Sequence, residues 1–168
     1  MDGQIKWFPS QNSDLKFRKT KEDKTVKYGP SEISKFTVEN MNFVPLKNFI
    51  VFSDNYALIG KTTEIKESFV QVISEGKFNI YLATITGYDP ISRKIQNYNN
   101  FIFQNSQGND KSLYAYPYLI RMKEKKYEKA KEKLYTLFKE YPEIIEKIKN
   151  FQKENNFLEI IDLVSKQK

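Results

Sequence analysis

Residues 69–82 read FVQVISEGKFNIYL, and this stretch decides the fold class of most of the chain. Two runs of β-branched and aromatic residues, 69–73 and 78–82, flank the short polar turn 74–77, which contains Gly76. Runs of this composition around a short glycine-bearing turn are typical of a β-hairpin. The stretch therefore predicts two antiparallel strands that pair with each other.

Similar signals surround this hairpin on both sides. Apolar and basic residues alternate in 15–18 and 26–28 around the polar connection 21–24, which predicts an earlier hairpin. Residues 36–38 and 48–52 are further strand candidates, and 31–34 suits one helical turn that Pro30 starts. Residues 100–103 and 112–116 predict a second pair of strands across the polar stretch 104–111. Between the two later hairpins, residues 87–99 contain Gly, Asp, Pro and several Asn, which indicates a mobile surface loop.

After Pro117 the spacing of apolar residues changes from two to about 3.6, which is the period of a helix. One helix should end before Pro142, a second should begin there, and Asn155 or Asn156 should cap a third. The inner faces of the three helices contain Tyr127, Ala130, Leu134, Leu137, Phe138 and Tyr141; Ile144, Ile145, Ile148 and Phe151; and Phe157, Ile160, Ile161 and Val164.

These patterns predict an α+β fold, in which a mostly antiparallel sheet of hairpins is followed by a C-terminal bundle of about three helices. The length of 168 residues suits a single domain, residues 1–168. Residues 1–118 form its β-rich part in this interpretation, and residues 119–168 form a helical part packed on it. Asn100 to Phe103 is a candidate exposed edge strand for pairing with a partner.

Composition narrows the classes of function. The chain has no His and no Cys, so the side chains most often used in acid-base, nucleophilic and transition-metal chemistry are absent. The net charge of +7 allows attraction to nucleic acid, anionic lipid or acidic glycans. In the helical part, however, acidic residues interleave with the lysines, which is typical of a solvated helix face. No apolar run approaches the roughly 18 residues of a membrane-spanning helix, and the residues after Met1 do not resemble a signal peptide.

Three motifs that suggest chemistry have ordinary structural explanations. Gly60-Lys61-Thr62 matches the end of a phosphate-binding loop, but the earlier glycine of that motif is replaced by Asn55 and no helix pattern follows. Gly108-Asn109-Asp110 has too few acids for a calcium loop and is explained as a turn. Four acids in or near predicted loops are candidates for a catalytic carboxylate pair, but solvated surface acids explain them better: Glu64, Glu67, Glu75 and Asp89.

An aromatic row is the remaining candidate for a ligand surface. Tyr114, Tyr116 and Tyr118 alternate with other residues, so on a strand their rings share one face. Such a row favours packing against the following helix, with a ligand surface or a single-stranded nucleic-acid platform as alternatives. Trp7 is interpreted as the anchor of an edge strand.

Several of these segments resemble a group of uncharacterised exported proteins common in Bacteroidetes. The resemblance rests on Gly3-x-Ile5 and on residues 15–18, 26–36 and 69–81, and covers roughly the first half of the chain. It consists of a turn motif and a hairpin motif, so it implies no catalytic residue. It does imply an exported protein that is associated with the cell envelope.

We therefore expect a non-enzymatic binding or assembly module of the cell envelope, with protein partners there and a periplasmic location. The alternative function is nucleic-acid binding through the basic helical tail, and the alternative location is the cytoplasm. The sequence predicts no catalytic residue, no metal ligand and no cofactor, and leaves the ligand and the oligomeric state open.

Overall fold

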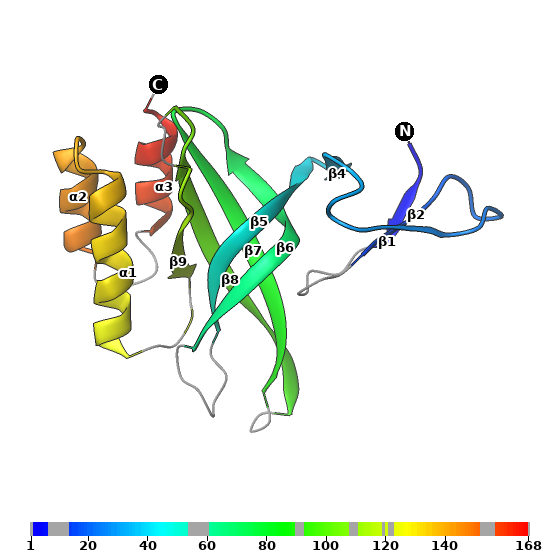
Figure 1. Ribbon diagram of the computed structural model, residues 1–168, viewed down its shortest axis with the longest axis horizontal. Helices are drawn as coiled ribbons and strands as arrows, with labels where there is room; N and C mark the ends of the chain where they lie inside the picture. Colours follow the sequence, from blue (N-terminus) through cyan, green and yellow to red (C-terminus); the bar gives the residue numbers. More distant parts are fainter. Residues whose placement is uncertain are drawn as a thin grey trace.

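The computed structural model describes residues 2–6, 14–53, 61–89, 93–107, 111–118, 120, 123–151 and 157–167. Within these residues the strands precede the helices along the chain (Figure 1). The strands are β1 (Gln4–Lys6), β2 (Leu15–Arg18), β3 (Val26–Tyr28), β4 (Phe36–Val38), β5 (Met41–Ser53), β6 (Lys61–Ser74), β7 (Phe78–Asp89), β8 (Lys94–Asn105) and β9 (Tyr114–Tyr118). The helices are α1 (Glu124–Leu137), α2 (Pro142–Lys149) and α3 (Phe157–Ser165).

The described strands form two antiparallel sheets. The smaller sheet has the order β1-β2-β3, and the larger has the order β4-β5-β6-β7-β8-β9. The three helices lie together on one side of the larger sheet, and the smaller sheet lies at the opposite end of the molecule (Figure 1). The predicted α+β class, with helices after an antiparallel sheet, is confirmed. That residues 1–168 form a single domain stays a prediction.

The hairpins predicted from alternation are present. In the β6–β7 pair Gln71 lies opposite Leu82, and the register shifts by one residue between Val72 and Ser74. The β2–β3 and β8–β9 pairs also form as predicted, and the helix faces are buried where the 3.6-residue spacing places them. Both β5 and β6 are longer than predicted. The two strands pair with each other, and the polar residues interspersed along them face solvent on one side of this β5–β6 hairpin.

The prediction of a loop over residues 87–99 is wrong. Strand β7 continues to Asp89, β8 begins at Lys94, and Gly87 lies opposite Gln96. The glycine has a packing role here, since a Cβ atom at position 87 would lie 2.9 Å from the ring of Tyr98. Tyr98 is buried, so the ring that covers the glycine stabilises a strand that the composition does not favour.

The prediction that residues 100–103 form an exposed edge is also wrong. Strand β8 pairs with β7 on one side and with β9 on the other. The two outer strands of the larger sheet are β4 and β9. The apolar run 101–103 is fully buried because it lies in an interior strand that is covered on both faces.

A side chain joins two strands that are not neighbours in the larger sheet. The fully buried Asn100 amide on β8 accepts a hydrogen bond from the Phe52 N–H of β5 at 2.7 Å. It also donates a hydrogen bond to the Phe52 carbonyl oxygen at 3.0 Å. The Asn100 side chain thus forms the two hydrogen bonds that the backbone of a neighbouring strand would form. The sheet curls, so that β5 approaches β8 and β9.

The main core lies between this curled sheet and the helices. Phe157, at the start of α3, stacks on Tyr116 of β9 with 4.3 Å between ring centroids. Phe138, which directly follows α1, contacts the rings of Phe78 on β7 and Phe103 on β8 at 4.9 Å and 5.8 Å. These contacts fix the helices to three adjacent strands of the sheet.

A second, smaller core attaches the N-terminal sheet. Leu15 of β2 is 3% exposed and packs among Phe36, Phe43 and Phe69 of the larger sheet. The Phe36 ring stacks on Phe43 and contacts Phe69 edge-on, both at 4.9 Å between centroids. A sheet of three short strands is marginal on its own, so this cluster holds it in place.

The raised pKa values of two tyrosines and a lysine indicate how the stability of the protein depends on pH. Burial is the main cause that raises the pKa of Tyr81 and Tyr135 above the ordinary value of 10.0. A hydrogen bond with Tyr141 is the main cause that raises the pKa of Lys77. The folded protein therefore holds these protons more tightly than the unfolded chain does. Stability should be constant between about pH 6 and 9, since the chain lacks His, and should fall above about pH 10.

Urea unfolding at neutral and alkaline pH measures this dependence, with tyrosinate absorbance as a second readout. The Tyr81→Phe variant is the control and should lose less stability between pH 9 and 11, because it removes one titrating group. An unfolding midpoint that stays constant from pH 9 to 11 in the unmodified protein would contradict the prediction.

Candidate functional site

The tyrosine row of β9 belongs to the core. Tyr116 is 1% exposed and is covered by Phe157, while Tyr118 is half-buried with its ring centroid 5.2 Å from that of Phe101. Tyr127 of α1 also contacts Tyr116, at 6.3 Å between centroids. The packing interpretation is confirmed, because Tyr116 is buried in the core and Tyr114 and Tyr118 pack against it.

The candidate carboxylates do not form a pair. Glu64 and Glu67 are three residues apart on β6, so their side chains lie on opposite faces of the strand. Glu67 forms an ion pair with Lys47 of β5 at 3.2 Å, and Glu75 is exposed in the β6–β7 turn. The side chain of Asp89 lies outside the described part. Among the described residues, no group of three or more acids is arranged to hold a metal ion.

The remaining motifs have structural roles or lie outside the described residues. Lys61 and Thr62 begin strand β6, whereas a phosphate-binding loop needs the first turn of a helix at this point. Gly60, Trp7 and residues 108–110 are outside the described ranges, as are the two candidate caps at 155–156. No described helix has both the length and the apolar character required to cross a membrane.

The lysines of the helical tail lie beside acids. On α1 the spacing of four residues produces one stripe of lysines and an adjacent stripe of glutamates. Lys131 is buried, and its ammonium donates hydrogen bonds to Glu128 at 2.9 Å and to the Phe151 carbonyl at 3.1 Å. The exposed members of the two stripes are Lys125, Lys129 and Lys133, and Glu124, Glu128 and Glu132. The arrangement matches the predicted solvated face.

A surface where basic side chains gather, with no acid among its described lining residues, occurs instead on the N-terminal sheet. Alternation along β2 places Leu15 and Phe17 on the face toward the second core, and Lys16 and Arg18 on the other face. Strand β3 continues this division, because Lys27 lies directly opposite Lys16. The outer face therefore presents basic side chains from two adjacent strands.

These residues border a shallow hollow of about 540 Å³ that is open to solvent. Side chains directly opposite each other on one face of an antiparallel pair have Cβ atoms about 5 Å apart. Lys16 and Lys27 are such a pair, and neither has an ion pair with a described residue. The hollow is lined by Gln4, Ile5, Lys16, Phe17, Arg18, Thr25 and Lys27.

Two contacts hold the guanidinium of Arg18 at the edge of this hollow. Its Nε–H donates a hydrogen bond to the Gln4 side-chain oxygen at 2.8 Å, and its Nη1 donates to the Lys21 carbonyl at 3.2 Å. The guanidinium has further N–H groups that take no part in these two hydrogen bonds. A guanidinium held in this way binds an anion with a smaller loss of side-chain freedom.

A glycine brings β1 close enough for the Gln4 contact. A Cβ atom at Gly3 would lie 2.6 Å from both the ring of Phe17 and the carbonyl oxygen of Arg18. Because the carbonyl is backbone, a larger residue would push β1 away from β2. Gly3 therefore allows the pairing that places Gln4 opposite Arg18.

Electrostatics gives this surface a preference for anions. Like charges directly opposite each other on a sheet destabilise it, and a bound anion relieves that repulsion. The alternation of 15–18 and 26–28 already indicated an outer charged face in the sequence. The sequence favours a solvated face for the helical lysines and gives nucleic-acid binding through the basic helical tail only as the alternative, because local charge density does not show which acids share a face with the lysines.

Comparisons with known proteins found no matching family model, no similar curated protein and no similar solved structure.

Proposed function

We propose that this protein is a non-enzymatic binding module that recognises an anionic partner through the outer face of its β1-β2-β3 sheet. One observation carries the proposal: Lys16, Arg18 and Lys27 border an open hollow, and none of the described residues that line it is an acid. The hollow is shallow and open and is built from short strands, which suits an extended ligand better than an enclosed small molecule.

The spacing of the cations also favours a repeating anion. Lys16 and Arg18 are two residues apart, which is about 6.6 Å along a strand. Lys27 adds a third cation from the neighbouring strand. A polymer or surface with successive negative groups can engage all three cations at once.

Removing two of the cations should weaken binding to a polyanion. The double variant Lys16→Ala/Lys27→Ala is expected to bind labelled dextran sulfate at least about tenfold more weakly at about 50 mM salt. The slope of log K against log salt should decrease by about 1 to 2. Fluorescence anisotropy over a salt series measures both quantities.

The matched control is Lys125→Ala/Lys129→Ala, which removes the same net charge from the exposed face of α1. It should change the affinity by less than about threefold, because these lysines alternate with glutamates. Equal losses in both double variants would show that binding follows net charge alone and would contradict the proposed surface. Failure of the unmodified protein to bind at low salt would contradict the function itself.

Nucleic acid is the second candidate ligand, and the net charge of +7 favours it. In the original expectation the helical tail binds it, so the control pair on α1 also tests this alternative. A labelled single strand of about 20 nucleotides is the probe. Loss of its binding in Lys125→Ala/Lys129→Ala, but not in the sheet variant, would place a nucleic-acid site on the helices.

We also propose an envelope location with a protein partner there, on the strength of the resemblance described above. Fractionation of the native cells with an antibody against the protein tests the location. Recovery in the cytosolic fraction alone would contradict it.

A further inference from the structure

A second hollow has the opposite charge. Helices α2 and α3 border a groove of about 460 Å³ at the helical end of the molecule. Its apolar lining comes from Phe151, Ile160 and Leu163, and its acids are Glu143, Glu146 and Glu159. Among its described lining residues, Lys147 is the basic one. The acidic rim of this groove is complementary in charge to a basic surface.

Two of the three rim acids are available to a partner. Lys147 forms an ion pair with Glu159 at 3.4 Å, which leaves Glu143 and Glu146 on the α2 side of the groove. Both are exposed, and neither has an ion pair with a described residue. Their local negative charge contrasts with the net charge of +7 of the whole chain.

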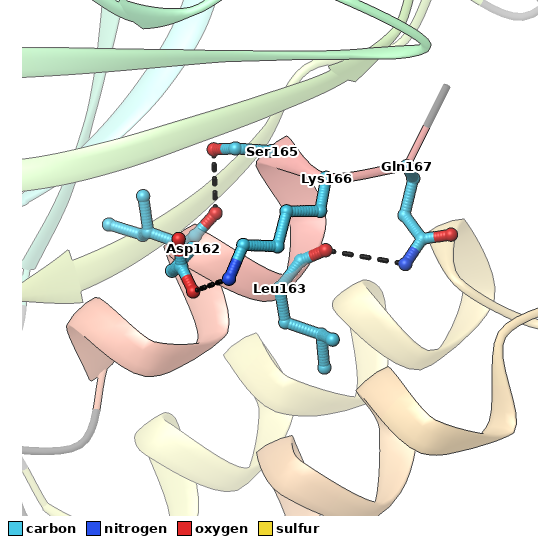
Figure 2. Close-up of polar contacts among 6 residues, drawn as sticks. Asp162, Leu163, Ser165, Lys166 and Gln167 are labelled. Carbon is cyan, nitrogen blue, oxygen red and sulfur yellow. Dashed lines mark hydrogen bonds and ion pairs between the residues drawn. The ribbon is translucent and has the colours of Figure 1, made fainter.

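The α3 wall of the groove is held by contacts at its C-terminal end (Figure 2). Lys166 pairs with Asp162 at 2.5 Å, so this acid of α3 is neutralised outside the groove. Gln167 donates a hydrogen bond to the Leu163 carbonyl at 3.3 Å, while the Leu163 side chain points away from the sheet, toward the neighbouring helices. Both contacts lie at the C-terminal end of α3, the helix that borders the groove.

The basic hollow and the acidic groove lie toward opposite ends of the molecule. The β1-β2-β3 sheet lies at one end of the longest axis and α2 lies at the other (Figure 1). The basic hollow and the acidic groove of one molecule therefore cannot contact each other unless the molecule rearranges. Each of them faces a different neighbouring molecule. Two copies placed end to end bring a basic sheet against an acidic groove.

We propose that the anionic partner of the basic sheet is the α2–α3 groove of a second copy of this chain. This inference rests on the proposed function and assigns its partner. The contact is head-to-tail, in which Lys16 and Lys27 of one copy face Glu143 and Glu146 of the next. A contact of this kind leaves one basic and one acidic end unoccupied, so association continues into chains unless a rotation closes a ring.

Salt dependence distinguishes this contact from other kinds of association. At about 10 mM salt the Debye length is about 30 Å, so the net charges of two copies repel across the whole contact. At about 150 mM the Debye length is about 8 Å, and the opposite charges at the contact dominate. At about 1 M it is about 3 Å, and these pairs are screened as well. Association should therefore be strongest at intermediate salt.

Two charge-reversal variants test the contact by sedimentation velocity of the full chain. Lys16→Glu/Lys27→Glu makes both surfaces acidic, and Glu143→Lys/Glu146→Lys makes both basic. Each variant alone should associate at least about tenfold more weakly than the unmodified protein. A mixture of the two should associate again, because the intact sheet of the second meets the intact groove of the first.

The matched controls are Lys125→Glu/Lys129→Glu and Glu124→Lys/Glu132→Lys on the exposed face of α1. They change the net charge equally and should leave association at about 150 mM salt within about threefold of the unmodified protein. Circular dichroism of every variant establishes that it is folded before its association is interpreted.

Three results would overturn the inference: a monomer at all salt concentrations, association that rises steadily with salt, or a mixture of the two variants that stays monomeric. The dextran sulfate assay separates this failure from that of the proposed function. An unmodified protein that stays monomeric but binds dextran sulfate through Lys16 and Lys27 retains the basic surface as a binding site and loses only the second copy as its partner.

Discussion

The Asn100→Leu variant is expected to lower the free energy of unfolding by about 2 to 5 kcal/mol. Leucine has the same number of side-chain heavy atoms and the same branching as asparagine, so the change removes the hydrogen bonds and keeps the overall shape of the side chain. Both the N–H and the carbonyl of Phe52 lose their partner, and each unsatisfied buried group costs about 1 to 3 kcal/mol. Urea unfolding followed by far-UV circular dichroism measures the loss.

Asn97→Leu is the matched control on the same strand. Asn97 is exposed and accepts a hydrogen bond from Thr86, so its replacement should cost less than about 1 kcal/mol. Equal effects at positions 97 and 100 would show that the link between β5 and β8 does not stabilise the curled sheet.

The Asn100→Asp variant adds a pH dependence to this test. A carboxylate accepts from the Phe52 N–H but cannot donate to the Phe52 carbonyl, and burial penalises its charge. The pKa of this Asp should therefore lie above its unfolded value of about 3.9. Protons then bind the folded state more tightly, so the variant should lose stability as the pH rises from about 4 to 7. A stability that rises over this interval would contradict the argument.

The Phe157→Ala variant is expected to cost about 3 to 5 kcal/mol. Phe157 is fully buried, stacks on Tyr116, and also contacts Phe101 at 5.3 Å and Phe151 at 5.5 Å between centroids. Truncation leaves a cavity between β9, β8 and the helices. In this variant the amides of α3 should exchange with solvent earlier than those of α1, because the Phe157 ring attaches the start of α3 to the sheet.

Leu158→Ala provides the comparison at the next position of the same helix. Leu158 is 57% exposed, so its truncation should cost less than about 1 kcal/mol. If both truncations destabilise the protein equally, the contacts of Phe157 in the aromatic cluster do not account for the cost.

The proposed surface was only partly readable in the sequence. Alternation predicted that Lys16 and Lys27 lie on the outer face of a hairpin, and this is confirmed. Three further features depend on parts of the chain that are remote or irregular: the approach of β1 at Gly3, the contact of Gln4 with Arg18, and the absence of acids from the hollow. Neighbouring side chains on different strands have no fixed spacing in sequence, so no local pattern encodes them.

The same division holds for the fold. The sequence by itself determined the β6–β7 hairpin and the three helices, because the periods of two and about 3.6 residues depend on local backbone geometry. Only the tertiary structure decided that residues 87–89 and 94–99 form strands, where the Tyr98 ring covers Gly87 and outweighs a composition typical of loops. It likewise decided the role of Asn100, an ordinary polar residue in sequence, because only the curled sheet brings Phe52 within hydrogen-bonding distance of it. The strands at 87–89 and 94–99 and the role of Asn100 both depend on long-range burial and strand register, which no short stretch of sequence encodes.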